Sequence, residues 1–236
     1  MVKPRDPPPH PSPTRGEGAA RARPRLYLIT PLVDDPAAFA PALEQALGAA
    51  DIAAVLLRLA KAGERTLIDR AKAVGTIVQR RDVALLLDGR PELAARASAD
   101  GAHLTGIETF AAALSLLKPD RIAGCGGLRS RHDAMLAGET GADYVMFGEP
   151  PPYPPPRAGE GKGGGHRLPF DELVERLQWW AQLFEIPCVG YAQNLDEVAP
   201  LVQTGADFIA LGEWIWSDPQ GAKRAIAAAA ERLAAP

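Results

Sequence analysis

Cysteine is almost absent from the sequence, which has only Cys125 and Cys188 among its 236 residues. They lie far apart, and neither belongs to a Cys-x-x-Cys pair or to a histidine-rich run. This pattern gives no support to a disulfide framework or to a structural zinc site. Cysteine usage of this kind favours the cytoplasm as the compartment of the protein.

Long apolar runs and a large charge of one sign are missing as well. No stretch approaches the roughly 20 apolar residues of a membrane-spanning helix, and Met1–Pro24 lacks the apolar core of a secretory signal. The net charge is only −3, so there is no basic field that would gather nucleic acid. With 47% hydrophobic and 23% charged residues, the composition is that of a globular protein. We therefore expect a globular domain that binds neither membranes nor nucleic acids.

Proline is scarce over most of the chain because it is concentrated in two segments. Residues 1–24 and 149–169 together hold 14 of the 23 prolines. Since proline has no N–H donor and a fixed φ, neither segment can form a helix or a central strand. We expect a disordered Pro-rich arm at residues 1–24 and a Pro/Gly-rich insertion at 149–169. A single domain is then expected over residues 25–236.

The rest of the chain alternates short apolar runs with helical patterns, eight times in about 210 residues. The expected strands are Leu26–Thr30, Ala53–Arg58, Ala84–Asp88, Gly101–Leu104, Arg121–Cys125, Tyr144–Gly148, Pro187–Ala192 and Phe208–Gly212. The expected helices are Ala37–Gly48, Glu64–Gln79, Pro91–Ala97, Thr109–Leu117, Arg131–Thr140, Phe170–Phe184, Leu195–Thr204 and Pro219–Ala234. Eight such units match a closed (β/α)8 TIM barrel. An open doubly wound sheet is the rival, but no Gly-rich fingerprint follows the first strand.

Two motifs next to the expected strands are fairly specific when they occur together. They are Asp-Gly-x-His-Leu at residues 100–104 and Gly-Ala-Asp-Tyr-Val-x-Phe-Gly at residues 141–148. With Leu26–Thr30, Leu57-Arg58, Leu87-Asp88 and Gly205-Ala206-Asp207, they occur in the order seen in thiamine phosphate synthases and their TenI-like relatives. The chain resembles this family over roughly residues 25–218.

The resemblance implies a transferase that acts at the carboxyl ends of the barrel strands. Family enzymes join an aminopyrimidine diphosphate to a thiazole phosphate and release pyrophosphate. They use a magnesium ion held by two acidic residues, together with Arg and Lys side chains. This chemistry is physically sensible, because a departing pyrophosphate needs cationic and metal stabilisation directed at its oxygens.

Carried over by position, the resemblance makes Arg58 the expected catalytic residue, on the diphosphate leaving group. Asp88 is expected as one magnesium ligand and Glu108 as the other, since hard oxygen ligands suit this ion. The residues expected to contact the phosphorylated substrates are Arg58, Gly126, Gly127, Tyr153, Gln193 and Gly212.

The later loops depart from the family pattern. Gly126-Gly127 stands in place of Ser-Thr, and Ala192-Gln193 stands in place of Gly-Gly. The Pro-rich segment that contains Tyr153 replaces a Thr-Pro-Thr-Lys loop, and Glu213 occupies the phosphate-facing position after the last strand. A carboxylate there repels a phosphate unless it is protonated or bound to a metal.

Each candidate also has a structural interpretation. Asp88 can cap the following helix, and Arg58 can pair with Asp88 or Glu213 without any substrate. His103 is expected to be a hydrogen-bonded core histidine, and Gly126-Gly127 can be a tight turn.

Two other functions therefore stay open beside the transferase. One is a non-catalytic barrel that binds a phosphorylated or acidic small molecule. The other is a metal-dependent hydrolase that uses Asp88, Glu149 and Glu213 at an acidic mouth. A homo-oligomer is compatible with all three functions.

Overall fold

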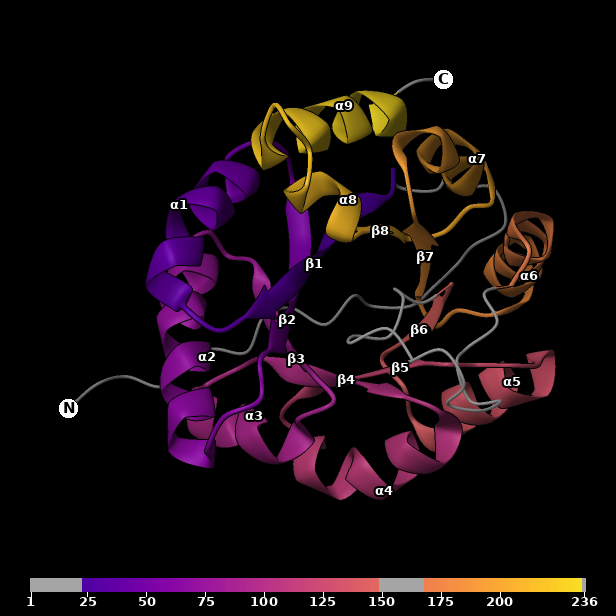
Figure 1. The fold of residues 1–236 in the computed structure, drawn as a ribbon. Coiled ribbons are helices and arrows are strands. Elements are labelled where there is room, and N and C mark those ends of the chain that lie inside the picture. The colour runs from indigo at the N-terminus through magenta and orange to yellow at the C-terminus, as the bar shows by residue number, and fades with distance from the viewer. Residues whose placement is uncertain (1–22, 149–167, 235–236) are drawn as a thin grey trace, which may run out of the picture.

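The eight expected strands form a closed barrel in a computed structural model of the chain, which describes residues 23–148 and 168–234. All neighbouring strands are parallel, and β8 pairs with β1 to close the ring. Figure 1 shows the ring of helices around the barrel. The predicted (β/α)8 barrel is thus confirmed. Apart from residues 23, 24, 168 and 169, the predicted arm and insertion lie outside the described residues.

The elements alternate along the chain. The strands are β1 Arg25–Val33, β2 Ile52–Leu59, β3 Ala84–Asp88, β4 Gly101–Thr105, β5 Ile122–Gly126, β6 Tyr144–Phe147, β7 Cys188–Ala192 and β8 Phe208–Leu211. The helices are α1 Pro36–Leu47, α2 Glu64–Gln79, α3 Pro91–Ala97, α4 Ile107–Leu117, α5 Arg131–Thr140, α6 Phe170–Leu183, the 3₁₀ turn η1 Leu195–Glu197, α7 Val198–Gln203, α8 Glu213–Trp216 and α9 Ala222–Ala234.

The helices differ from expectation by more than one residue at four places, one of which is α9, which begins at Ala222 rather than at Pro219. The helix expected at 195–204 is split, because Asn194 accepts hydrogen bonds from two backbone N–H groups and starts the separate turn η1. The short helix α8 was not expected at all. Helix α4 begins two residues early, at Ile107, because Gly106 reverses the chain with φ of +90°.

The apolar side chains form two layers, as alternation along a strand requires. In β2, Val55 and Leu57 point outward into the layer between the sheet and the helices, whereas Leu56 points into the barrel. The inner layer also contains Tyr27, Tyr144 and other side chains from β1, β3, β6, β7 and β8. By the same alternation, Arg58 and Asp88 at the carboxyl ends of β2 and β3 belong to the inner face.

Three aspartates make the same pair of hydrogen bonds at the amino end of the barrel. Each lies directly before an even-numbered strand, donates its backbone N–H to one residue of the preceding strand, and accepts the N–H of that residue with Oδ2. The pairs are Asp100 with Leu85 (2.9 and 2.7 Å), Asp143 with Ala123 (2.9 and 2.7 Å) and Asp207 with Cys188 (3.0 and 2.9 Å). These three aspartates, two of them in Gly-Ala-Asp motifs, therefore join neighbouring strands at the end of the barrel opposite Arg58.

Removing one of these carboxylates should destabilise the fold. We expect Asp207→Ala to lower the free energy of unfolding by about 1–2 kcal/mol, because it leaves the buried N–H of Cys188 without this acceptor. Asp207→Asn keeps an oxygen acceptor and is the matched control, with a smaller loss. Urea unfolding of the two variants measures the difference. Equal stability of both variants and the parent would contradict a role for this hydrogen bond.

No helix in the two described segments combines the length and the apolar character needed to cross a membrane.

Candidate functional site

The strand register places Asp88, His103 and Tyr144 in one row across β3 to β6, which starts at the carboxyl end of β3 and reaches β6 at its first residue. Asp88 is the cross-strand partner of His103, His103 of Gly124, and Gly124 of Tyr144. In a parallel sheet, residues in such a row present their side chains on the same face. This row lies on the inner face, where Tyr144 packs with the other side chains that fill the barrel.

Arg58 and Asp88 form an ion pair at the carboxyl end of the barrel. Arg58 Nε lies 3.5 Å from Asp88 Oδ2, and the two side chains are 11% and 34% exposed. The buried hydroxyl of Thr30 accepts the backbone N–H of Arg58 at 3.0 Å and so fixes the end of β2 against β1. The sequence suggests two partners for Arg58, Asp88 and Glu213. In the structure, Arg58 pairs with Asp88.

This ion pair leaves one donor unused. Arg58 Nε is buried and has no hydrogen-bond partner among the described residues, because its contact with Asp88 is too long and too poorly aligned for a hydrogen bond. A buried donor without a partner is costly, and a charged one more so. Burial also raises the pKa of the Asp88 carboxyl, while the Arg58 guanidinium acts in the opposite direction. The pair is therefore suited to receive further oxygen ligands.

A buried hydrogen-bonded network fills the barrel next to this pair. The hydroxyl of Tyr144 lies 2.9 Å from the hydroxyl of Tyr27 and 2.9 Å from Nδ1 of His103. The rings of His103 and Tyr144 stack, with centroids 5.6 Å apart. Burial raises the pKa of both tyrosines, so both stay neutral. His103 is thus hydrogen-bonded and buried, as expected.

His103 should make the stability of the protein depend on pH. Burial lowers its pKa to about 4, compared with about 6.5 in an unfolded chain. The unfolded state therefore binds more protons, and the stabilisation is complete above about pH 6.5 and is lost as the pH falls towards 4. From pH 7 to pH 5 this group should lower the free energy of unfolding by about 2 kcal/mol. In urea unfolding, His103→Gln should lack that part of the loss, and an unchanged pH dependence would contradict the assignment.

Tyrosine side chains inside the barrel leave no room for a Cβ at two glycine positions. A Cβ on Gly124 would lie 2.1 Å from Cζ of Tyr144, and one on Gly212 would lie 2.6 Å from the hydroxyl of Tyr191. Gly212, one of the expected substrate contacts, is therefore also required for packing. The hydrogen bonds of Tyr27 and Tyr144 inside the barrel were not expected from the sequence. The alternation of inward and outward side chains along β1 and β6 could have indicated that both tyrosines point inward.

The other expected site residues lie in the loops at the same end of the barrel. Gly127 has φ of +68° and approaches the end of β4 so closely that a Cβ would lie 2.6 Å from Cγ2 of Thr105. The carbonyl of Gly126 accepts the N–H of Gly106 at 2.8 Å. These contacts fit the tight turn considered from the sequence.

Gln193 and Glu108 have different surroundings. The backbone N–H of Gln193 donates to Glu197 Oε2 at 2.8 Å, so this N–H is already used within the protein. Glu108 is exposed in the first turn of α4, next to the carboxyl end of β4. Tyr153 and Glu149 lie outside the described residues.

The short helix α8 is fixed to the barrel by two indole groups. Trp214 Nε1 donates to the carbonyl of Ala192 at 3.0 Å, and Trp216 Nε1 donates to the carbonyl of Ile29 at 2.7 Å. These carbonyls belong to β7 and β1, the two neighbours of β8. Helix α8 thus holds Gly212 and the exposed Glu213 in place at the mouth.

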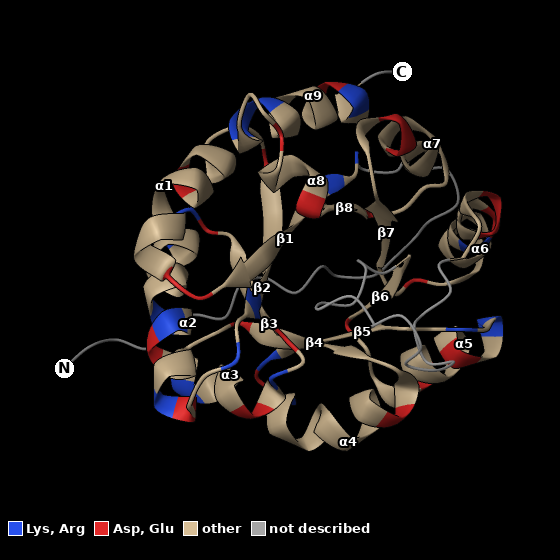
Figure 2. Cartoon of the chain, in the orientation of Figure 1, with Lys and Arg blue, Asp and Glu red and all other residues tan. Residues whose placement is uncertain are grey.

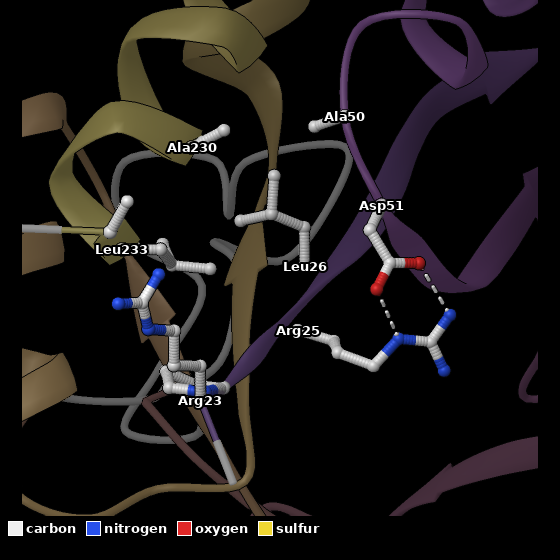
Figure 3. Close-up of a pocket in the computed structure, with 9 residues that line it drawn as sticks. Arg23, Arg25, Leu26, Ala50, Asp51, Ala230 and Leu233 are labelled. Carbon is white, nitrogen blue, oxygen red and sulfur yellow. Dashed lines mark hydrogen bonds and ion pairs between the residues drawn. The ribbon is translucent and has the colours of Figure 1, made fainter.

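Two hollows on the described surface are lined by neither Arg58 nor Asp88. One, of about 290 Å³, is lined by Arg131, Glu172, Glu175 and Arg176. The other, of about 160 Å³, lies between the start of β1 and the end of α9. Figure 3 shows Arg25 beside it, joined to Asp51 by hydrogen bonds of 2.9 and 2.7 Å. This hollow is at the amino ends of the strands, away from the site.

Charge is sparse on the barrel wall. Figure 2 shows strands that are mostly uncharged, with the charged residues concentrated on the outer helices and loops. Against this background, the inward Arg58–Asp88 pair stands out. The described residues contain no group of three or more His, Cys, Asp or Glu side chains that could hold a metal ion.

Fold and site together define a (β/α)8 barrel with an arginine–aspartate ion pair at the carboxyl ends of its strands, the end at which barrels of this type place their chemistry. A family model described as thiamine monophosphate synthase matches residues 26–215. The chain belongs to this family.

Individual relatives agree with this assignment. The chain is 43% identical to the thiamine-phosphate synthase of Rhodospirillum centenum over 205 residues, which are 86% of this chain and 94% of the relative. It is 38% identical to the thiamine-phosphate synthase of Hyphomonas neptunium over 217 residues, covering 88% and 93%. Among solved structures, a thiamine phosphate pyrophosphorylase from Pyrococcus furiosus has a TM-score of 0.70 and 20% identity, covering 90% of this chain and 96% of that one. At this identity the structural likeness concerns the fold.

Proposed function

We propose that the protein is a thiamine phosphate synthase. It would join an aminopyrimidine diphosphate to a thiazole phosphate: a bond forms between the pyrimidine methylene carbon and the thiazole nitrogen. The bond from that carbon to the diphosphate oxygen breaks, and its electron pair leaves with pyrophosphate. Family membership and the 43% identical relative support this reaction.

The single observation that carries the proposal is the unused donor of Arg58. A buried guanidinium Nε without a hydrogen-bond partner among the described residues is suited to an anionic oxygen. It lies at the carboxyl end of β2, where barrels of this type place their chemistry. Arg58 would bind the diphosphate and stabilise the charge that develops on it as it leaves.

Magnesium fits the carboxylates present at this end of the barrel. The ion is commonly held by one or two carboxylates, with waters and substrate phosphates as its other ligands. Asp88 ends β3 and Glu108 opens α4, directly after the neighbouring strand β4. Asp88 and Glu108 would hold the ion, which when bound would neutralise charge on the diphosphate.

The remaining substrate contacts are proposed on the loops around the mouth. Gly126, Gly127, the Gln193 side chain and Gly212 would face the phosphorylated thiazole, and Tyr153 would join them from the Pro-rich segment. Backbone N–H groups of glycine turns are suited to phosphate oxygens. The exposed Glu213 lies beside Gly212 on α8.

Complementation of a thiamine-requiring strain, followed by assay of the purified protein with both substrates and magnesium, tests the proposal. Growth and release of pyrophosphate are expected. Substrate binding without product would instead identify a non-catalytic binding barrel. Metal-dependent hydrolysis that Glu213→Gln abolishes would identify the hydrolase alternative.

A further inference from the structure

The imidazole of His103 has a partner for only one of its two nitrogens. Nδ1 lies 2.9 Å from the hydroxyl of Tyr144, whereas Nε2 has no hydrogen-bond partner among the described residues. His103 is only 3% exposed. Its Nε2 is nevertheless not one of the two side-chain atoms in those residues that are both wholly buried and unpartnered, which are Arg58 Nε and Arg121 Nε. The small exposed part of His103 therefore includes Nε2.

The hydrogen bonds inside the barrel indicate which nitrogen carries the proton. Tyr27, Tyr144 and a neutral His103 have one donor hydrogen each, and the two hydrogen bonds that join them use two of the three. If Tyr27 donates to Tyr144 and Tyr144 donates to Nδ1, the unused donor is Nε2–H. In the two other arrangements a buried tyrosine hydroxyl keeps an unused hydrogen, which costs free energy. The network therefore favours the Nε2–H tautomer.

This N–H is directed away from the amino end of the barrel. The two nitrogens of an imidazole point away from each other, and Nδ1 of His103 faces Tyr144, the first residue of β6. Towards the carboxyl end, the next inward residues on β4 and β5 are Thr105 and Gly126, which are cross-strand partners. Both are small. Neither β4 nor β5 thus places a large side chain between Nε2 and the mouth.

His103 also lies beside the ion pair at the mouth. It is the cross-strand partner of Asp88, and both side chains belong to the inner face. Two residues before Arg58 and Asp88, Leu56 and Leu86 point inward from the same strands. The Nε2 donor therefore lies next to the pair that would bind the diphosphate and next to an apolar surface below that pair.

We propose that His103 is a substrate-binding residue, whose Nε2–H donates a hydrogen bond to a ring nitrogen of the aminopyrimidine. Tyr144 is its positioning residue, because its hydroxyl holds Nδ1. The inference rests on the proposed function, in which Arg58 binds the diphosphate. The flat pyrimidine ring then lies on Leu56 and Leu86. A neutral donor in this otherwise apolar wall selects a ring that has a nitrogen lone pair over one that has only C–H groups.

Calorimetric titration of the full chain with two ligands, in the presence of magnesium and without the thiazole, tests the inference. The ligands are the aminopyrimidine diphosphate and pyrophosphate, which lacks the ring. His103→Phe keeps an aromatic ring but has no nitrogen, so it should weaken binding of the aminopyrimidine diphosphate by about tenfold or more. Binding of pyrophosphate should not change.

The outcomes separate this inference from the proposed function. Equal weakening for both ligands, or no change for either, would overturn the role of His103 and leave the proposed function standing. A parent protein that does not bind the aminopyrimidine diphosphate would contradict both. Thermal melting of His103→Phe checks that the variant is folded.

Nitrogen-15 NMR of the histidine rings gives a test on the unaltered protein, which does not depend on the folding of a variant. In the free protein, His103 should carry its proton on Nε2, with Nδ1 as the acceptor. The aminopyrimidine diphosphate should shift the Nε2–H signal more than pyrophosphate does. A proton on Nδ1, or an equal response to the two ligands, would overturn the inference.

The two tyrosines of the network provide a matched pair of variants. Tyr144→Phe and Tyr27→Phe each remove one buried hydroxyl, but only the hydroxyl of Tyr144 contacts His103. Tyr144→Phe should weaken binding of the aminopyrimidine diphosphate and release the proton from its fixed place on Nε2. Tyr27→Phe should leave both the affinity and the tautomer unchanged. Equal effects of the two variants on affinity and tautomer would overturn the positioning role of Tyr144.

Discussion

Replacing Arg58 with methionine is expected to lower kcat/KM for pyrophosphate release about 10²–10³-fold. Methionine keeps most of the apolar volume of the side chain but has no charge and no N–H donor. The loss corresponds to the removal of one well-placed donor for a developing anion, about 2.7–4 kcal/mol of transition-state stabilisation. Steady-state assay with both substrates and magnesium measures it. Since Arg58→Lys keeps the charge but has no guanidinium, its loss should be smaller.

The same change affects stability, because Asp88 loses its cation at a half-buried position. The pKa of Asp88, already raised by burial, should rise further when Arg58 is removed. Urea unfolding therefore accompanies the kinetic assay, so that rates refer to folded protein. A folded Arg58→Met variant with kcat/KM close to that of the parent would contradict the role given to Arg58.

Adding one methyl group at Gly124 is expected to cost about 3 kcal/mol of folding stability. The new Cβ would lie 2.1 Å from Cζ and 2.4 Å from Cε1 of Tyr144, so the ring or the strand must move. This is the upper part of the usual range for overpacking a core. The displaced ring also strains the hydrogen bonds of Tyr144 to Tyr27 and His103. Chemical denaturation measures the loss.

The chain offers a control and a rescue for this change. Gly63→Ala meets no atom within 4 Å and should cost less than about 1 kcal/mol at its helix-cap position. In a Tyr144→Ala background, the additional cost of Gly124→Ala should nearly vanish, because the ring that it strikes is gone. Additive losses in the double variant would show that the contact with Tyr144 is not the cause.

Much of the fold follows from local sequence patterns. All eight strands, and helices such as α2 and α5, could be predicted because short apolar runs, helical periodicity and a glycine at a helix end, such as Gly141 after α5, are signals within a few residues. Helix α8 could not, since four residues are too few to show a helical period. It is held by the hydrogen bonds of Trp214 and Trp216 to β7 and β1, which are distant in the sequence.

The site was predictable to a lesser degree. Arg58 and Asp88 could be named because each is a charged residue at the end of an apolar strand, and the structure brings them together. The inner network of Tyr27, Tyr144 and His103 depends on the register of β4, β5 and β6 and on the absence of a side chain at Gly124. No local pattern contains that information. Gln193 could be identified as a loop residue, but its N–H bond to Glu197 could not.

The hydrogen-bonded aspartates at the amino end of the barrel affect what a sequence motif in such a protein indicates. Asp100, Asp143 and Asp207 join neighbouring strands at the amino end of the barrel, so the motifs that contain them have a structural reason that does not involve the reaction. Residues at the carboxyl ends of the strands could then change without the loss of these hydrogen bonds. A Gly-Ala-Asp motif at the amino end therefore has a role in the barrel and does not by itself identify the reaction at the opposite end.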